Sequence, residues 1–343
     1  MCTGIRLIGA DGAVVYGRTQ EWGAFDLMSD VLIAPRTLEM KSSMPGGKPG
    51  ATWQSRYGLV GLNGLKRPFI LDGVNEKGLA CGAFYLPGFA EYEEYTPENA
   101  PMGINSLEVV HYLLSMCASV AEVKAALEQI KVVSVVFKEI GICPPLHYAV
   151  TDPSGASLVI EYVNQGELKL YDNPLGVITN APTFDWHLIN LRNYVNLSPV
   201  AVPPKKLDDI LFTPLGAGSG MLGLPGDFTP PSRFVRAVAF TQTARHTKDG
   251  LDTVQEVFRI LDNFNIGVGM AEGSDLKKDN PLLGATQWTT AIDIKNLVFY
   301  YHTCWNRRLR KIDLKALDFE GNEVITLSMD EKRMEDMLDI TPR

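Results

Sequence analysis

The start of the chain constrains the fold most, because two strand-like stretches at 3–8 and 13–18 flank an Asp11-Gly12 dipeptide. Both stretches carry Ile, Leu, Val or Tyr residues, which favour strands. An Asp-Gly dipeptide between two such stretches is typical of a tight β-hairpin. The sequence therefore predicts that the protein begins with two paired antiparallel strands.

Cys2 stands at the head of this hairpin, at the end where Arg18 also lies. If Met1 is removed, the Cys2 thiol and the new α-amino group belong to one residue. A terminal amine has a pKa of about 7.7–8.0 and a thiol about 8.5, so the amine can accept the proton of its own side chain. That arrangement supplies a nucleophile and its base without a separate histidine. A cysteine after Met1 carries no meaning alone, so the rest of the chain has to support it.

The remainder of the chain alternates blocks of strands with paired helices. Strands are predicted at 30–35, 58–62, 69–72, 79–85, 147–151, 157–162, 169–171, 177–179, 289–294, 297–302 and 309–314. The strand at 30–35 is expected to extend the hairpin sheet. Helices are predicted near 106–117, 119–130, 232–245 and 253–264, the first capped by Asn105 or Ser106 and the second opened by the Ser119-x-x-Glu122 capping box.

This order of elements predicts an α+β fold of antiparallel sheets with helices packed outside. No shift in composition marks a linker, so one domain is predicted over residues 1–343. The segment 196–226 is rich in Pro and Gly and too long for a routine connection. It is expected to be a functional loop or an arm that reaches another subunit, and the apolar content of 196–222 favours an oligomerisation arm.

Charge and cysteine content narrow the classes of partner. The net charge is −8, and no basic stretch is present to neutralise phosphates, which argues against nucleic acid. No apolar run approaches the ~18 residues of a membrane span, and the first residues do not resemble a signal peptide. A soluble cytoplasmic protein is expected. The five cysteines form no C-x-x-C pair and suit reduced thiols.

Several chemical motifs are absent or incomplete. Gly218-Ser-Gly-Met-Leu-Gly223 is followed by Leu-Pro-Gly where a dinucleotide site needs a helix. The five histidines have no metal-binding spacing, so neither a metal nor a cofactor is indicated. A Ser-His-Asp triad stays open on residue counts, although no G-x-S-x-G elbow is present.

Together with Cys2, four segments resemble the choloylglycine hydrolase family, which comprises conjugated bile salt hydrolases and penicillin V acylases. The segments are Gly17-Arg-Thr-Gln-Glu-Trp22, Asp72-Gly-Val-Asn-Glu-Lys-Gly-Leu79, Thr179-Asn-Ala-Pro-Thr-Phe-Asp-Trp-His187 and Gly223-Leu-Pro-Gly-Asp-Phe-Thr-Pro-Pro-Ser-Arg-Phe234. Each motif alone is weak, but Cys2 and the four segments in this order are highly specific. The likeness runs from Cys2 to about residue 315. The resemblance implies an N-terminal nucleophile hydrolase, with an αββα sandwich of two antiparallel sheets flanked by helices, usually tetrameric, that cleaves an amide in a non-peptide substrate.

The resemblance also implies roles for individual residues. Cys2 would be the nucleophile, released by removal of Met1, and Arg18 the active-site arginine whose guanidinium favours thiolate. Asn180 would donate its side-chain amide to the oxyanion, and Arg233 would be a second active-site arginine. By sequence alone, Asn180 also suits a turn before Ala-Pro, and Arg233 a surface position at the start of a helix.

Two positions bear on how closely the chain follows the family pattern. Glu21 stands where the family commonly has Asp, so the detailed geometry around the amine differs by one methylene. Tyr85 stands where bile salt hydrolases typically carry Asn and penicillin V acylases Tyr. Its ring would favour a flat phenoxyacetyl group over a bulky sterol, and its backbone N–H would be the second oxyanion donor. Trp22 and Phe25 are expected to complete the pocket wall.

The sequence thus predicts an N-terminal cysteine amidohydrolase of the penicillin V acylase type, acting on a small-molecule amide as a homotetramer without a cofactor. Conjugated bile acids and N-acyl homoserine lactones are alternative substrates. A rival from another class is a catalytically inactive binding protein that keeps the fold and retains Met1. The mass of the intact protein separates this rival from the enzyme, because retained Met1 blocks the amine.

Overall fold

The predicted hairpin forms in a computed structural model of the chain, which describes residues 1–273 and 282–342. β1 (Cys2–Ile8) pairs antiparallel with β2 (Val14–Glu21), and the register sets Cys2 opposite Gln20 and Gly4 opposite Arg18. The prediction that Cys2 and Arg18 lie at the same end of two paired strands is therefore confirmed.

The hairpin forms one edge of a five-stranded antiparallel sheet with the order β1-β2-β16-β17-β18. Its other strands are β16 (Thr286–Asp293), β17 (Val298–Thr303) and β18 (Arg310–Asp313), which correspond to the strands predicted at the end of the chain. β16 pairs directly with β2. The first strands of the chain and β16, which follows much later in the sequence, therefore lie side by side next to the nucleophile candidate.

A second antiparallel sheet of eight strands has the order β13-β12-β11-β8-β7-β6-β3-β19. Its strands are β3 (Asp30–Ala34), β6 (Leu59–Asn63), β7 (Ile70–Asn75), β8 (Ala80–Tyr85), β11 (Leu146–Thr151), β12 (Ser157–Val163), β13 (Glu167–Asp172) and β19 (Ile325–Ser328). The prediction that residues 30–35 extend the hairpin sheet is wrong, because residues 22–29 carry the chain across to the other sheet. The strand predicted at 177–179 is only an isolated bridge between Gly4 and Ile178.

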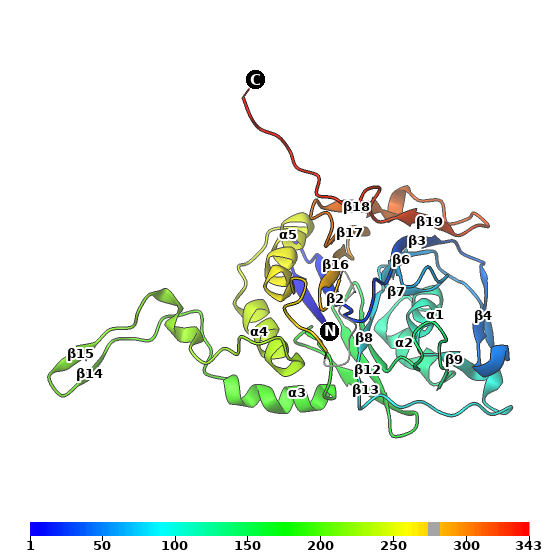
Figure 1. Ribbon diagram of the computed structural model, residues 1–343, viewed down its shortest axis with the longest axis horizontal. Helices are drawn as coiled ribbons and strands as arrows, with labels where there is room; N and C mark the ends of the chain where they lie inside the picture. The colour runs from blue at the N-terminus through cyan, green and yellow to red at the C-terminus, as the bar shows by residue number, and fades with distance from the viewer. Residues whose placement is uncertain (274–281, 343) are drawn as a thin grey trace.

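Helices cover the outer faces of both sheets (Figure 1). α1 (Val109–Met116) and α2 (Val120–Leu127) lie on the side of the eight-stranded sheet, whereas α4 (Pro230–Thr243) and α5 (Gly250–Leu261) cover the five-stranded sheet. A further helix, α3 (Phe184–Leu191), was not predicted. The smaller sheets pair β4 (Glu39–Ser43) with β5 (Pro49–Gln54) and β9 (Gly103–Asn105) with β10 (Lys131–Val133).

Caps were predicted for two helices, and the structure confirms one of them. Ser119 Oγ accepts a hydrogen bond from the Glu122 amide at 3.2 Å, which confirms the cap of α2. The cap predicted for α1 is wrong, because α1 begins after Glu108 without a side-chain cap. Asn105 instead accepts from the Leu107 amide at 3.1 Å and belongs to the turn that precedes the helix.

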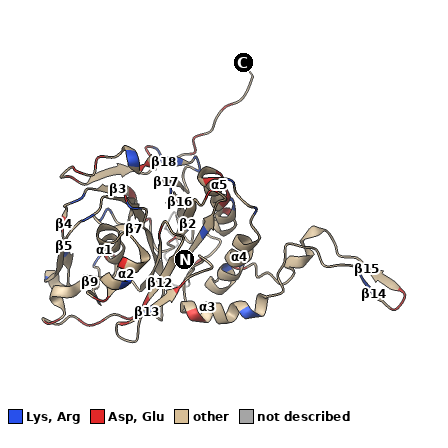
Figure 2. Cartoon of the chain, turned by 180° about the vertical axis from the view of Figure 1, so that it is seen from behind, with Lys and Arg blue, Asp and Glu red and all other residues tan. Residues whose placement is uncertain are grey.

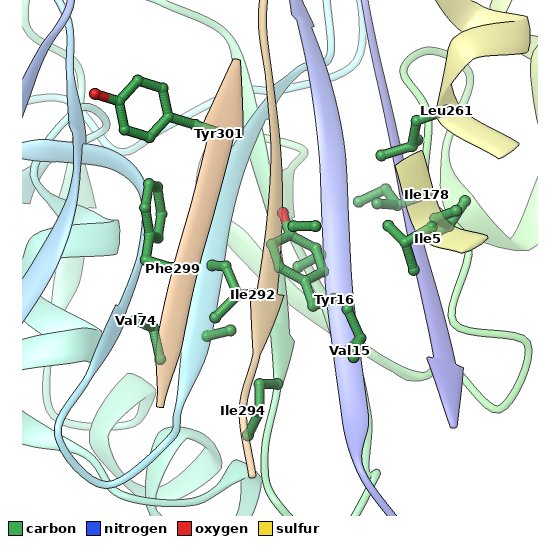
Figure 3. Packing of buried hydrophobic residues seen from close by; sticks show 14 of the residues in the cluster. Ile5, Val15, Tyr16, Val74, Ile178, Leu261, Ile292, Ile294, Phe299 and Tyr301 are labelled. Carbon is green, nitrogen blue, oxygen red and sulfur yellow. The ribbon is translucent and has the colours of Figure 1, made fainter. Parts of the chain in front are cut away.

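Apolar side chains pack on both faces of the five-stranded sheet, between the two sheets and beneath α4 and α5 (Figure 3). Tyr16 and Ile292 enter the layer between the sheets from the five-stranded sheet, and Val74 enters it from the eight-stranded sheet. A separate buried cluster joins α1 and α2 to the other face of the eight-stranded sheet. Each such side chain contributes about 1.5–3 kcal/mol when it is fully buried. The order helix, sheet, sheet, helix is the predicted αββα sandwich.

The segment 196–222 leaves the body of the molecule as a long arm, seen from opposite sides in Figures 1 and 2. Its tip is a small hairpin of β14 (Lys205–Leu207) and β15 (Ile210–Phe212). Apolar side chains on the arm are largely exposed, namely Val200, Val202, Leu207, Ile210, Leu211, Phe212, Leu215 and Leu222. Within residues 1–273 and 282–342, no helix has the length and apolar character needed to span a bilayer.

Candidate active site

Alternation along β2 decides which side chains face the second sheet. Gly17 faces α5, since a Cβ at this position would lie 2.5 Å from Val257 Cγ1. Tyr16, Arg18 and Gln20 therefore point to the opposite side, toward the eight-stranded sheet. On β1, a Cβ at Gly4 would lie 2.7 Å from the ring of Phe84 in β8. Cys2 shares this face with Gly4, so its thiol also points between the sheets.

The Cys2 thiol lies close to Gln20, its partner in the strand register. Sγ is 3.7 Å from Gln20 Oε1, and Cys2 is 2% exposed. Arg18 is fully buried on the same face and donates from Nη2 to Gln20 Oε1 at 2.5 Å. The structure thus brings the predicted pair Cys2 and Arg18 together, with Gln20 between them. Sequence reasoning missed Gln20, which no motif marks.

Arg18 is fixed by contacts on several sides. Nη1 donates to the Ala83 carbonyl at 2.5 Å, and the guanidinium carbon lies 4.2 Å from the centre of the Phe84 ring. Burial acts to lower the pKa of Arg18, but the nearby Cys2 and Asp72 raise it above its ordinary value. A guanidinium held in this way is a permanent positive charge beside the thiol, and such a charge favours thiolate.

Asp72 lies behind Arg18 and accepts from two hydroxyl groups. Tyr16 donates to Oδ1 at 2.9 Å and Thr290 donates to Oδ2 at 2.8 Å. Burial raises the pKa of Asp72 to about 6, against the opposing effect of Arg18. A Cβ at Gly82 would lie 2.4 Å from Tyr16 Oη, which comes from the facing sheet, so glycine is required there for the two sheets to come this close.

Asn180 joins the first strand to the end of β8. Its Oδ1 accepts from the Cys2 backbone nitrogen at 2.7 Å and from Arg233 Nη2 at 2.6 Å. Its Nδ2 donates to the Tyr85 carbonyl at 2.8 Å. Arg233 Nη1 also donates to the Cys2 carbonyl at 2.5 Å and to Thr3 Oγ1 at 2.9 Å. Burial lowers the pKa of Arg233 to about 10.

Two buried histidines hold the backbone that carries Asn180. His187 lies 2.8 Å from the Asn180 carbonyl, and burial lowers its pKa to about 4, so the neutral ring donates from Nε2. His147 lies 3.2 Å from the Thr179 carbonyl and 3.0 Å from Glu161 Oε1. Glu161 also accepts from the Phe184 amide, which begins α3, at 3.0 Å.

Glu21 lies at the opening of the site rather than against Arg18. Its Oε1 accepts from Thr286 Oγ1 at 2.6 Å, whereas Oε2 is buried and has no partner among the residues described. The Met1 α-amino group donates to the Glu21 carbonyl at 2.9 Å. Burial lowers the pKa of this amino group below its ordinary value, and the nearby Glu21 carboxylate partly opposes that effect.

A small inner chamber of about 70 Å³ lies against Cys2 and Gln20. Its walls are largely aliphatic and aromatic, with Trp22, Phe25, Leu71, Tyr85, Leu107 and Leu146 among them. An outer cleft of about 670 Å³ shares Trp22, Phe25 and Tyr85 with the inner chamber and extends over Met1, Glu21 and Asn180. Cys2 therefore lies between an apolar chamber on its side-chain side and an open cleft on its amino side.

The predicted wall residues form one aromatic cluster. The centre of the Trp22 ring lies 5.2 Å from the centre of the Tyr85 ring and 5.7 Å from that of Phe25, and both contacts are edge to face. Within the described ranges 1–273 and 282–342, no group of three or more His, Cys, Asp or Glu side chains is placed to hold a metal ion.

Comparisons with known proteins agree on one family. The family model described as linear amide C–N hydrolases, choloylglycine hydrolase family, matches residues 2–327. A bile salt hydrolase/transferase from Clostridium perfringens is 35% identical over 333 residues, or 95% of this chain and 96% of the relative. A penicillin V acylase from Pectobacterium atrosepticum is 28% identical over 326 residues, or 89% of this chain and 78% of the relative.

A solved structure extends this likeness to three dimensions. The C2A mutant of conjugated bile acid hydrolase from Clostridium perfringens superposes with a TM-score of 0.86 at 30% identity. The superposition covers 99% of this chain and 100% of the other. The likeness therefore includes both sheets and the flanking helices.

Proposed function

The chain belongs to the choloylglycine hydrolase family of linear amide C–N hydrolases, and we propose that it acts as an N-terminal cysteine amidohydrolase of the penicillin V acylase type. The observation that carries the proposal is the position of Cys2. Its thiol faces an apolar chamber beside a buried arginine, and its nitrogen is held by Asn180. Residues 1–343 would act as one catalytic domain.

Removal of Met1 would turn the Cys2 nitrogen into the catalytic amine. Asn180 Oδ1 already accepts from this nitrogen, and the unpartnered Glu21 Oε2 is an acceptor for a second N–H once Met1 is gone. A buried amine has a lowered pKa, which keeps it unprotonated and able to accept the thiol proton. Glu21 would thus fulfil the role for which the family commonly uses Asp.

The reaction proceeds through a thioester. The amine takes the proton of the Cys2 thiol, and the thiolate attacks the amide carbonyl carbon to form a C–S bond. The resulting ammonium group protonates the departing nitrogen as the C–N bond breaks, which releases the amine product. Water then attacks the thioester, the Cys2 amine accepts its proton, and the carboxylic acid leaves as the thiolate regains that proton.

Two donors would stabilise the oxyanion, one of them the second N–H of Asn180 Nδ2, since the first is donated to the Tyr85 carbonyl. The other is the Tyr85 backbone N–H. Leu146, which is opposite Tyr85 in the sheet, directs its N–H and carbonyl to the Tyr92 hydroxyl. Leu146 and Tyr85 are therefore a non-hydrogen-bonded pair, and the Tyr85 N–H points to the side of its carbonyl, toward Asn180.

The choice of substrate depends on the inner chamber. Tyr85 lines both the chamber and the outer cleft, as Trp22 and Phe25 do, so its ring lies where the two spaces adjoin. A flat aryl acyl group would stack on these rings more readily than a sterol, which favours an aryl-substituted acetamide such as penicillin V. Conjugated bile acids remain the second candidate, because the Clostridium perfringens relative is named a bile salt hydrolase/transferase.

Replacement of Tyr85 by asparagine should shift specificity toward glycocholate. Loss of the ring joins the chamber to the cleft and opens volume for a sterol. Pocket changes of this size are worth about 1–3 kcal/mol, so the ratio of kcat/KM for penicillin V to that for glycocholate should fall by roughly ten- to a hundredfold. Steady-state assays of both substrates test this. The same ratio in wild type and Tyr85→Asn would remove the support for the acylase preference.

We further propose that the arm at 196–222 ties the protein into a homotetramer. Replacement of residues 203–214 by a Gly-Gly link should give smaller particles in multi-angle light scattering. The replacement removes exposed apolar side chains, such as Leu211 and Phe212, that would bind the neighbouring subunit. Leu251→Ser removes an exposed leucine from α5 and is the matched control. An unchanged particle mass after the deletion would refute the role of the arm.

A further inference from the structure

Gln20 brings an amide group into a chamber whose other lining side chains, apart from Cys2, are aliphatic or aromatic. The orientation of that amide is fixed by Arg18. A guanidinium only donates hydrogen bonds, so the atom that faces Arg18 Nη2 at 2.5 Å is the oxygen, Oε1. Nε2 is therefore turned away from Arg18, on the other side of the same planar group.

Nε2 also lies beside the nucleophile, because Oε1 of the same amide is 3.7 Å from Cys2 Sγ. No hydrogen bond from Nε2 is found within the parts of the chain that the structure describes, and Nε2 is not one of the buried polar atoms that lack a partner, so water can reach it. A substrate that displaces this water without offering an acceptor leaves the donor unsatisfied, which costs free energy, so the site selects for a bound group that can accept. The first atoms of an acyl chain beyond the reacting carbonyl occupy this region when Sγ is in contact with the carbonyl carbon.

We propose that Gln20 selects acyl groups with an oxygen at the β atom, present as an ether or as a ketone, by donating a hydrogen bond from Nε2. The inference rests on the proposed function, since it requires the acyl chain to occupy the inner chamber while Cys2 attacks. A phenoxyacetyl group carries an ether oxygen at that atom and a 3-oxoacyl group carries a ketone. A bile acid side chain has only a methylene group there, which leaves Nε2 without a partner.

Two amides that share a leaving group test the proposal. N-phenoxyacetylglycine and N-(3-phenylpropanoyl)glycine differ only by the exchange of the β oxygen for a methylene group. Wild type should prefer the ether by about tenfold in kcat/KM, as expected for one uncharged hydrogen bond and the desolvation of its donor. In Gln20→Met, which keeps the length of the side chain, the ratio should fall to about one.

The ratio is the readout because Gln20 also contacts Arg18 and Cys2, so the absolute rate of the variant is expected to change. Gln129→Met is the matched control, since Gln129 is exposed at the end of α2, and it should keep the wild-type ratio. Tyr85→Phe removes the hydroxyl of another chamber residue and should also keep it. A second pair, N-(3-oxo-octanoyl) and N-octanoyl homoserine lactone, distinguishes ketone from ether as the accepted group.

A wild-type ratio near one in both pairs, or a preference that survives in Gln20→Met, would overturn the proposal, as would a preference lost in Tyr85→Phe. If wild type cleaves the amide bond of none of the four compounds, the proposed function fails. Calorimetric titration of the Cys2→Ala protein then decides the role of Gln20 separately. Phenoxyacetamide should bind about tenfold more tightly than 3-phenylpropanamide. Equal binding would overturn the proposal without any catalytic step.

Discussion

The Cys2→Ala variant should lose amide hydrolysis, with a fall in kcat/KM of about 10⁴-fold or more, because no covalent intermediate can form without the thiol. Cys2 is 2% exposed at the wall of the inner chamber, and the smaller alanine side chain fits its site without new contacts. The variant should therefore fold like the parent, as judged by circular dichroism and thermal unfolding. Cys2→Ser should also be severely impaired, since a hydroxyl is much harder to deprotonate than a thiol.

The matched control is Cys304→Ala, which removes an exposed cysteine far along the chain. It should hydrolyse penicillin V at the parental rate. Substantial hydrolysis by purified, folded Cys2→Ala protein would exclude Cys2 as the nucleophile.

Asn180→Ala should lower kcat by about 10²–10³-fold with a smaller change in KM, because the hydrogen bond to the oxyanion forms mainly in the transition state. Asn180→Asp separates this role from the positioning of the strand. The aspartate keeps an oxygen for the Cys2 nitrogen and for Arg233, but it loses the donor that faces the Tyr85 carbonyl. We expect Asn180→Asp to be at least as impaired in kcat as Asn180→Ala.

Asn75→Ala is the control for the loss of a buried asparagine. Asn75 donates from Nδ2 to the carbonyls of Leu114 and Cys117, on the side of α1, outside the site. It should lower the unfolding temperature while the activity of the folded protein is retained. Should Asn180→Ala change KM alone, Asn180 would bind substrate without stabilising the oxyanion.

Local patterns in the sequence predicted the hairpin and the strands well, because turn chemistry and strand propensity act between near neighbours. They did not place β3, which pairs with β6 in the opposite sheet although it follows the hairpin directly. Helix α3 was not predicted, because it has only eight residues and its N-cap residue Thr183 makes no side-chain capping hydrogen bond. Its first turn is organised by Glu161 from a distant strand, which is a tertiary contact.

The residues of the site were also predicted only in part. Resemblance to the family indicated Cys2, Arg18, Asn180 and Arg233, and the structure brings all four within one hydrogen-bonded group around β1. Gln20 was missed, since its importance depends on the register that sets it opposite Cys2 and on the chamber beyond. Neither is visible in a single sequence, because both depend on how two sheets are spaced.

The central claim is that Cys2, freed of Met1, becomes acylated. Mass spectrometry of the protein, quenched in acid during turnover of a phenoxyacetyl amide and then digested, tests it most directly. The account predicts that the N-terminal peptide begins at Cys2 and carries a phenoxyacetyl group as a thioester, and that the Cys2→Ala protein carries none. An N-terminal peptide that retains Met1 in fully active protein, or an acyl group on another cysteine, would contradict it.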